Sequence, residues 1–367
     1  MAFTADDHIF MARALQLAEQ GLTSTMPNPR VGCVIVKDGS KGKIVIGEGA
    51  HLKAGEPHAE VFALRQAGEQ ARGATLYVTL EPCSHTGRTP PCSQAIIDAG
   101  ITKVIAAMQD PNPLVAGSGL AYLQANNIEV ASGLMQAQAE VLNPGFISRM
   151  TRQLPFVRSK IAASLDGKTA LNNGQSQWIT SGPARLDVQH WRARSCAILT
   201  GIGTVLADNP SMTVRDIPKE KQALKVIVDS RLQVPIDAKI LQGGNVLIAF
   251  AQPNPLKEAQ LLAVGAELLC IPNSDGKVCL KTLLSHLASQ QINEVLVEGG
   301  EGLNGALLAL SLIDELLIYY APKLMGGGAK NMFALPELTN MKQAINLQII
   351  ELRQIGTDIR VRAKPLC

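Results

Sequence analysis

The chain has 367 residues, 46% hydrophobic and 18% charged, which is typical of a globular protein with two domains. The formal net charge of +3 argues against a long nucleic acid as partner, although a small phosphorylated ligand needs only a few arginines or lysines. The N-terminal segment lacks the pattern of a signal peptide, and no apolar run approaches the roughly 18–20 residues that span a bilayer. We therefore expect a cytoplasmic protein with reduced cysteines and no membrane partner.

The first 150 residues alternate between predicted helices and strands. Apolar residues at helical spacing predict helices over 6–20, 58–66, 93–99 and 119–126. Short apolar runs predict strands over 31–36, 43–49, 75–80, 103–108 and 128–132, and the first two of these flank a hairpin turn. This pattern predicts a three-layer α/β domain over residues 1–150.

A second α/β pattern occupies residues 151–367, after a predicted junction at 143–155. Helices are predicted over 183–193 and 303–311. Strands are predicted over 196–200, 225–229, 245–250, 294–300 and 315–322, with a C-terminal hairpin at the end. Two domains without an internal repeat are therefore expected.

Cys83 and Cys92 lie in EPCSHTGRTPPC (81–92), separated by eight residues that include two prolines. Three explanations are open: a disulfide, two ordinary buried thiols, or a metal site. The chain has seven cysteines, an odd number, and thiols in a reducing compartment normally stay reduced. The disulfide is therefore the least favoured explanation.

One imidazole and two thiolates, from His58, Cys83 and Cys92, suit a tetrahedral zinc ion whose fourth position is open to water. Zinc lowers the pKa of such a water toward ~7, and Glu60 is the carboxylate available to move its protons. A single histidine or cysteine is more often a packing residue. The joint pattern, with Cys92 opening a helix that favours a thiolate, makes the zinc interpretation the stronger one.

His-Ala-Glu at 58–60 resembles the first half of the cytidine-deaminase signature, H-x-E followed by P-C-x-x-C. The wider cysteine spacing departs from that signature. Together with NPRVG (28–32) and PHAE (57–60), however, EPCSHTGRTPPC resembles the deaminase domain of the bifunctional riboflavin-biosynthesis deaminase/reductase family. This resemblance implies a cytidine-deaminase-like α/β/α fold and a diaminopyrimidinone substrate with a phosphoribosylamino group, whose ring 2-amino group is replaced by oxygen.

The resemblance also implies roles for individual residues of the first domain. Zinc would be bound by His58, Cys83 and Cys92, with Glu60 as the catalytic proton carrier. The substrate would be contacted by Asn28, His51, Asp110 and Arg88, the last at the phosphate. Arg88 could equally be a solvated loop residue. His85 is a rival zinc ligand, but only His58 brings a neighbouring carboxylate.

GGEGLNG (299–305) contains G-x-G-x-x-G between a predicted strand and a predicted helix, a weak signal for a dinucleotide site. The acidic residue expected about 20 positions later is missing, so a standard Rossmann domain is not favoured and the cofactor leans toward NADP. Glycine amides at a helix N-terminus can still bind a phosphate. The alternative is a tight turn that needs glycine for positive φ.

Five stretches of the second domain resemble the reductase half of the same family, a dihydrofolate-reductase-like fold. They are KIAASLDGK (160–168), SQWITS (176–181), GIGTVLADNPSMTVR (201–215), VEGG (297–300) and YYAPKLMGG (319–327). The resemblance implies that NADPH transfers a hydride to C1′ of the ribosyl group and gives a ribityl product.

Matching positions give two groups of candidate residues in this domain. The NADPH group is Ala162, Trp178, Thr204, Asp208, Ser230, Gly300, Glu301, Gly302, Leu303, Asn304, Gly305 and Ala306. The substrate group is Lys160, Ser176, Arg192, Met212, Arg215 and Glu298. Trp178 could instead be a core aromatic residue, and the two arginines could be surface residues. Lys160, Asp208 and Glu298 are all open candidates for a proton donor.

Three functions are compatible with these patterns. The favoured one is a bifunctional enzyme that deaminates and then reduces one small phosphorylated pyrimidine, using Zn²⁺ and NADPH. A nucleoside or nucleic-acid deaminase is disfavoured by the long cysteine spacing and the lack of a basic face. A regulatory module with structural zinc is disfavoured because structural sites usually have four protein ligands. The family further implies a homo-oligomer, a dimer or a tetramer.

Overall fold

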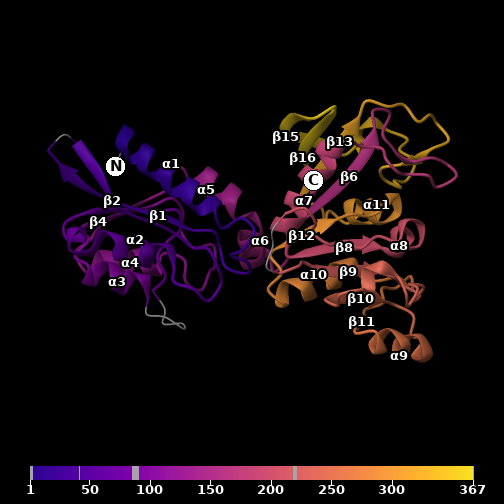
Figure 1. Ribbon diagram of the computed structural model, residues 1–367, viewed down its shortest axis with the longest axis horizontal. Helices are drawn as coiled ribbons and strands as arrows, with labels where there is room; N and C mark the ends of the chain where they lie inside the picture. The colour runs from indigo at the N-terminus through magenta and orange to yellow at the C-terminus, as the bar shows by residue number, and fades with distance from the viewer. Residues whose placement is uncertain (1–2, 41, 85–90, 218–220, 367) are drawn as a thin grey trace. The chain divides into compact units, whose positions relative to one another are not determined.

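The protein is described here by a computed structural model that covers residues 3–40, 42–84, 91–217 and 221–366 (Figure 1). It divides into two compact units, Met1–Gln153 and Leu154–Cys367. No helix in these described ranges is long and apolar enough to cross a membrane. The division falls inside the predicted junction, but residues Pro144–Arg152 form a helix of the first unit, because Phe146 packs into that unit's core.

The first unit contains a five-stranded mixed sheet in the order β2-β1-β3-β4-β5. Its strands are β1 (Gly32–Gly39), β2 (Gly42–Ala50), β3 (Thr75–Val78), β4 (Lys103–Ala106) and β5 (Glu129–Ser132). Its helices are α1 (Ala5–Glu19), α2 (Ala59–Ala67), α3 (Cys92–Asp98), α4 (Ser118–Ala125), α5 (Gln136–Leu142) and α6 (Pro144–Arg152), with a 3-10 turn at Gly68–Ala71. All nine helices and strands predicted for the first 132 residues are present, with bounds shifted by a few residues.

Helices α1 and α5 cover one face of this sheet, and α2, α3 and α4 cover the other (Figure 1). Two glycines allow the helices to approach closely. A Cβ at Gly32 would lie 1.9 Å from the Ala14 carbonyl oxygen of α1, and one at Gly49 would lie 2.0 Å from that of Ala59 in α2. The β1–β2 hairpin therefore fixes the first turn of α2, where His58 and Glu60 are found.

The second unit is built on a nine-stranded sheet in the order β11-β10-β9-β8-β12-β6-β13-β16-β15. Its strands are β6 (Phe156–Ser164), β8 (Ala197–Gly201), β9 (Leu224–Val228), β10 (Val246–Phe250), β11 (Glu267–Cys270), β12 (Glu294–Val297), β13 (Glu315–Ala321), β15 (Asn346–Ile355) and β16 (Asp358–Leu366). A separate two-stranded sheet pairs β7 (Lys168–Ala170) with β14 (Lys330–Asn331). The strands from β11 to β13 are parallel, and β16 and β15 continue the sheet as an antiparallel hairpin.

The helices of this unit are α7 (Gly182–Arg194), α8 (Ile202–Asp208), α9 (Pro255–Ala263), α10 (Leu280–Ser289) and α11 (Glu301–Ala309), with 3-10 turns at Lys239–Leu241 and Met341–Gln343. Side chains of α10 and α11 pack on one face of the sheet, and those of α7, α8 and α9 pack on the other. The strand predicted over 294–300 ends at Val297, because Gly300 is the N-cap of α11.

Buried charges anchor α7 to the sheet. The Trp191 ring lies under the guanidinium groups of Arg158, Arg194, Arg360 and Arg362, at 4.6 to 5.7 Å from its centroid. Arg158 is almost fully buried and is paired with two glutamates, Glu294 on β12 and Glu315 on β13. This network fixes the C-terminal turn of α7, which carries Arg192.

Candidate active sites

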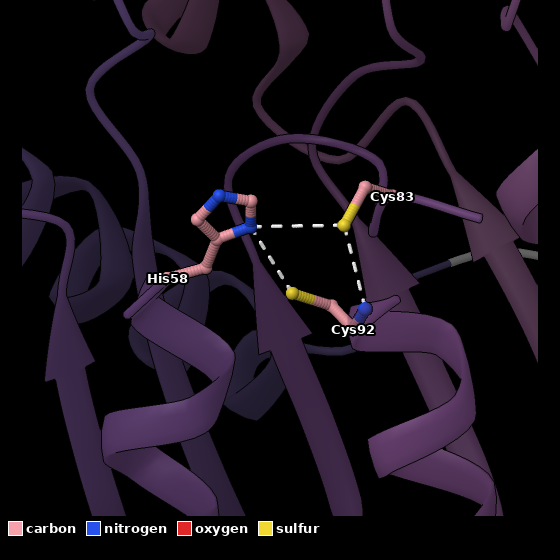
Figure 2. A group of neighbouring side chains, drawn as sticks. All are labelled: His58, Cys83 and Cys92. Atoms are coloured by element: carbon pink, nitrogen blue, oxygen red, sulfur yellow. Dashed lines mark hydrogen bonds between the residues drawn. The ribbon is translucent and has the colours of Figure 1, made fainter. Parts of the chain in front are cut away.

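Three side chains from separate elements of the first unit converge at one point (Figure 2). His58 is the N-cap of α2, Cys83 follows β3, and Cys92 is the first residue of α3. The Nδ1 atom of His58 lies 3.2 Å from Sγ of Cys92 and 3.7 Å from Sγ of Cys83. Both thiols are free, so they do not form a disulfide.

These separations fit a zinc ion. Tetrahedral zinc with one nitrogen and two sulfur ligands places the ligand atoms about 3.5–3.8 Å apart. A hydrogen bond from Cys92 and another from His58 outweigh burial and lower the pKa of Cys83 to about 4. The same contact with Cys83, together with burial, raises the pKa of Cys92. A divalent cation between the sulfurs would remove this conflict, because it stabilises both as thiolates.

The carboxyl group of Glu60 lies beside this cluster. Glu60 is 3% exposed, and its Oε2 atom has no hydrogen-bond partner among the described residues. Burial raises its pKa, although the nearby His58 acts in the opposite direction. An unpaired buried carboxylate oxygen next to a set of three zinc ligands suits a group that exchanges protons with a water bound there.

Asn28 and His51 lie next to the cluster. The His51 ring is edge-on to the His58 ring at 5.3 Å, and its Nδ1 lies 3.1 Å from the Pro57 carbonyl oxygen. Because Nδ1–H donates to that carbonyl, Nε2 accepts from the Asn28 side-chain amide at 3.1 Å. The Asn28 carbonyl oxygen is then oriented as an acceptor.

Of three other residues singled out in the sequence, one is described by the structure. Asp110 is half-buried at the end of the segment that follows β4, and its Oδ1 accepts from the Asn112 backbone N–H at 2.8 Å. Arg88 and the rival ligand His85 lie outside the described residues, so their predicted roles stay predictions.

The second unit contains a cavity of about 1740 Å³ at the carboxyl ends of its parallel strands. Every candidate substrate residue of this unit and most candidate cofactor residues line it. The candidate residues that line the cavity are Lys160, Ala162, Ser176, Trp178, Arg192, Thr204, Asp208, Met212, Arg215, Ser230, Glu298, Gly300, Glu301, Gly302, Leu303 and Ala306. Asn304 and Gly305 do not line it, because the α11 face that carries them points into the protein.

The glycines of residues 299–305 have two different roles. None of them has a positive φ, so the tight-turn explanation is wrong. A Cβ at Gly305 would lie 2.2 Å from the Ala334 carbonyl oxygen, and this glycine permits close packing. In the described part of the chain, a Cβ at Gly302 would have nothing within 4 Å, and one at Gly300 would have only Thr204 Oγ1, at 4.0 Å. These two glycines leave the first turn of α11 open to a ligand.

Three charged side chains form a buried group at the cavity wall. Glu298 accepts two hydrogen bonds from the Arg192 guanidinium, and its Oε2 lies 3.7 Å from Nζ of Lys160. Burial opposes ionisation of Glu298, but the charges of Arg192 and Lys160 lower its pKa to about 2. Burial also lowers the pKa of Lys160, and Glu298 offsets this only in part.

Arg192 and Arg215 differ in what they can offer a ligand. Arg192 is buried, and its third nitrogen, Nη1, donates to the Thr213 carbonyl oxygen at 3.0 Å, while Nη2, which also donates to Glu298, contacts the Met212 sulfur. Arg215 is exposed, and its backbone N–H donates to the Gln189 side chain at 2.9 Å. The guanidinium at the cavity that is open to a phosphate is therefore that of Arg215.

Trp178 is 63% exposed, so the alternative of a core aromatic residue is wrong. The guanidinium of Arg185 stacks on the Trp178 ring, 4.5 Å from its centroid. The Trp178 carbonyl oxygen accepts a hydrogen bond from Nζ of Lys323 at 2.8 Å. Arg185 also lines the cavity and was missed in the sequence, because its stacking depends on how the chain turns before α7. Ser176 donates to Asp208 at 3.1 Å and links a candidate substrate residue to a candidate cofactor residue.

Comparison with known proteins identifies both domains. Residues 4–108 match the cytidine and deoxycytidylate deaminase zinc-binding region, and residues 155–361 match the RibD C-terminal domain. The riboflavin biosynthesis protein RibD of Escherichia coli K12 is 48% identical, over 96% of this chain and 98% of its own length. The chain belongs to the RibD family.

Two solved structures are similar to it over nearly the whole chain. RibD of Acinetobacter baumannii has a TM-score of 0.91 and 47% identity, covering 98% of this chain and 99% of that one. A Thermotoga maritima protein described as a diaminohydroxyphosphoribosylaminopyrimidine deaminase/5-amino-6-(5-phosphoribosylamino)uracil reductase has a TM-score of 0.85 and 33% identity, with the same coverage. As a RibD protein, the chain is a bifunctional riboflavin biosynthesis enzyme, a zinc-dependent deaminase and an NADPH-dependent reductase. The expectations for fold class, function and cofactors are confirmed.

Proposed function

We propose that the first unit deaminates 2,5-diamino-6-(5-phosphoribosylamino)pyrimidin-4-one, and that the second unit then reduces the ribosyl group of the product to ribityl. The expected limits of the two catalytic domains, 1–150 and 151–367, are moved to 1–153 and 154–367 in this proposal, because α6 ends at Arg152 and belongs to the first unit. The convergence of His58, Cys83 and Cys92 beside the buried Glu60 carboxylate carries the deaminase half. The Thermotoga relative supports the substrate, because its description names the same pair of activities.

In the first unit, His58, Cys83 and Cys92 would hold the zinc ion, which supplies a water activated for attack on the ring carbon that carries the 2-amino group. Glu60 accepts the proton of that water and delivers it to the departing nitrogen, so that water and the amine become a ring carbonyl and ammonia. Its raised pKa suits a group that both accepts and gives a proton near neutral pH.

Substrate orientation in this unit is assigned to four side chains. His51 holds the Asn28 amide so that its oxygen accepts a hydrogen bond from the base. Asp110 is assigned to the base and Arg88 to the phosphate, where a guanidinium provides paired donors. These contacts would place the reacting carbon at the ligand cluster.

In the second unit, NADPH supplies the hydride for C1′ of the opened ribosyl group. We assign the cofactor phosphates to the open first turn of α11 at Gly300 and Gly302, and the substrate phosphate to Arg215. We assign Lys160 as the proton donor. The Glu298 carboxylate, 3.7 Å from its Nζ, favours the protonated ammonium form of Lys160 at the cavity wall. Arg192 is a positioning residue that orients Glu298.

A smaller cavity of about 260 Å³ supports the preference for NADPH over NADH. It shares Ile202, Val228, Ser230, Asp275 and Lys277 with the large cavity and is also lined by Arg231. Asp275 lies there too, so the two basic side chains exceed the one acid. This charge suits the additional phosphate of NADPH.

We further propose that the enzyme works in the cytoplasm as a homo-oligomer, without a nucleic-acid or membrane partner. The thiols of Cys83 and Cys92 must stay reduced to bind zinc, which favours a reducing compartment. A second copy is proposed to bind at β15, the edge strand of the nine-stranded sheet. Its exposed Leu347, Ile349, Ile350 and Leu352 form an apolar edge that a dimer or tetramer would cover.

The test uses full-length, zinc-loaded protein and measures ammonia release and NADPH oxidation separately. Wild-type protein should release ammonia from the diaminopyrimidinone phosphate without NADPH, and should oxidise NADPH only once the deaminated product is present. Glu60→Gln should lower ammonia release by roughly 10³-fold or more while NADPH oxidation on pre-deaminated substrate stays unchanged. Glu69→Gln, an exposed substitution of the same type in this unit, is the matched control. If Glu60→Gln loses both ammonia release and NADPH oxidation, the proposal that the two sites work independently is wrong.

A further inference from the structure

The Glu81 carboxylate accepts four backbone hydrogen bonds from a segment about 30 residues further along the chain. Its Oε2 accepts from the N–H groups of Asp110 and Gly117, both at 2.9 Å. Its Oε1 accepts from those of Gly119, at 2.8 Å, and Leu120, at 3.2 Å. Glu81 is 6% exposed, so these bonds are shielded from water. Among the described residues, every hydrogen-bond partner of this buried carboxylate is a backbone amide.

Two neighbouring contacts join the same pair of segments. A Cβ at Gly119 would lie 2.0 Å from the Pro82 carbonyl oxygen, so the start of α4 rests directly on the backbone after Glu81. The hydroxyl groups of Ser84 and Ser118 are 2.8 Å apart. Residues 81–84, which include Cys83, are therefore held against residues 110–120 at successive positions. We call this set of contacts the Glu81 latch.

The latch has a consequence for the deaminase reaction. One of the four N–H groups bound by Glu81 belongs to Asp110, and Glu81 is separated from Cys83 by only one residue. We propose that Glu81 is a positioning residue that fixes Asp110 relative to the zinc ligand Cys83 and so determines where the substrate ring lies above the metal. This inference rests on the proposed function, in which Asp110 contacts the base.

A carboxylate is needed at this position because four donors converge on it. In Glu81→Gln the new NH₂ group donates only, so two of the four N–H groups would face another donor in a site without water. Each buried amide left without an acceptor costs about 1–3 kcal/mol. The 110–120 segment would therefore move away from residue 81. His58 and Cys92 keep their places at the starts of α2 and α3, and Cys83 keeps its hydrogen bonds from the backbone N–H groups of Ser93 and Cys92.

The experiment measures deamination kinetics, zinc content and amide exchange for full-length Glu81→Gln, with Glu69→Gln as control. We expect KM for the diaminopyrimidinone phosphate to rise about tenfold or more, with kcat changed less than about threefold. Zinc per chain and NADPH oxidation on pre-deaminated substrate should equal those of wild type. Hydrogen exchange should accelerate in the peptide that covers residues 110–120 and not elsewhere in the unit.

Two further variants separate positioning from general support of the fold. Gly119→Ala pushes α4 off the Pro82 carbonyl and keeps the Glu81 carboxylate, whose Oε1 would lie 3.2 Å from the new Cβ. It should raise KM in the same way if Glu81→Gln does not fold. In an Asp110→Asn background, Glu81→Gln should raise KM by less than about threefold, because the residue through which it acts is already altered.

The outcomes are distinguishable. If wild-type protein releases no ammonia from this substrate, the proposed function fails, and the role of Asp110 fails with it. If wild type is active but Glu81→Gln loses zinc, lowers kcat alone, or adds its full effect to that of Asp110→Asn, the positioning role is overturned and the proposed function stands.

Discussion

At the scale of single residues, partners distant in the sequence decide what a side chain can do. Arg192 and Arg215 were both placed among the candidate substrate residues from the sequence. In the structure the Arg192 guanidinium is occupied by Glu298, 106 positions away, whereas that of Arg215 is exposed. Arg192 therefore stabilises the ionised carboxylate of Glu298, which in turn contacts Nζ of Lys160.

The Lys160 assignment gives a prediction with a defined pH dependence. Lys160→Met should lower kcat of the reductase about 10²-fold, in the range of lost general acid catalysis, and leave the Kd of NADPH within about twofold. Burial lowers the pKa of Lys160 below its ordinary 10.5, so wild-type activity should fall as pH rises through that lowered value. The residual activity of Lys160→Met should not show this decrease at high pH.

The control for this prediction is Lys342→Met, which removes an exposed ammonium from the same unit. The measurements are kcat against pH and NADPH binding by fluorescence. An alkaline limb that persists in Lys160→Met would assign the proton donor to another group, with Asp208 as the next candidate at the cavity.

At the scale of elements, the strongly periodic segments were predictable and the sites between them only in part. Apolar spacing located the helices and strands of the first 132 residues, because each buries one face against a shared core, but it did not predict α5 at Gln136–Leu142. The junction 143–155 was not predicted as a helix, since its polar residues conceal the packing of Phe146. The zinc ligands were predictable from residue types, whereas the Glu81 latch depends on contacts that only the folded chain creates.

The edge strand β15 gives a prediction about assembly. Its partner on one side is β16, and Leu352 is 69% exposed. If a second copy covers this strand, Leu352→Glu should place a charge in an apolar interface and shift the protein toward monomers. Light scattering after size exclusion measures this shift. Leu256→Glu, which adds the same charge at an exposed position of α9, should leave the mass unchanged. A monomeric wild type would exclude the interface.

At the scale of the whole molecule, each unit has its own core and its own site. The hydrophobic residues of the first unit form one cluster, and those of the second form three around the nine-stranded sheet. The zinc ligands belong to the first unit alone, and the cavity-lining residues to the second alone. The two reactions should therefore be separable by removing the metal.

Removing zinc with a chelator should abolish ammonia release and leave NADPH oxidation on pre-deaminated substrate unchanged. Adding zinc back should restore deamination, because the starts of α2 and α3 hold His58 and Cys92, and the Ser93 N–H donates to the Cys83 carbonyl oxygen, without the ion. Cys92→Ser should reproduce the loss without a chelator and bind less than about one tenth of the wild-type zinc, measured by mass spectrometry. Cys270→Ser, at an exposed cysteine of the second unit, should change neither activity. A reductase that fails when only zinc is removed would mean that the second site depends on the first, which the separate cores argue against.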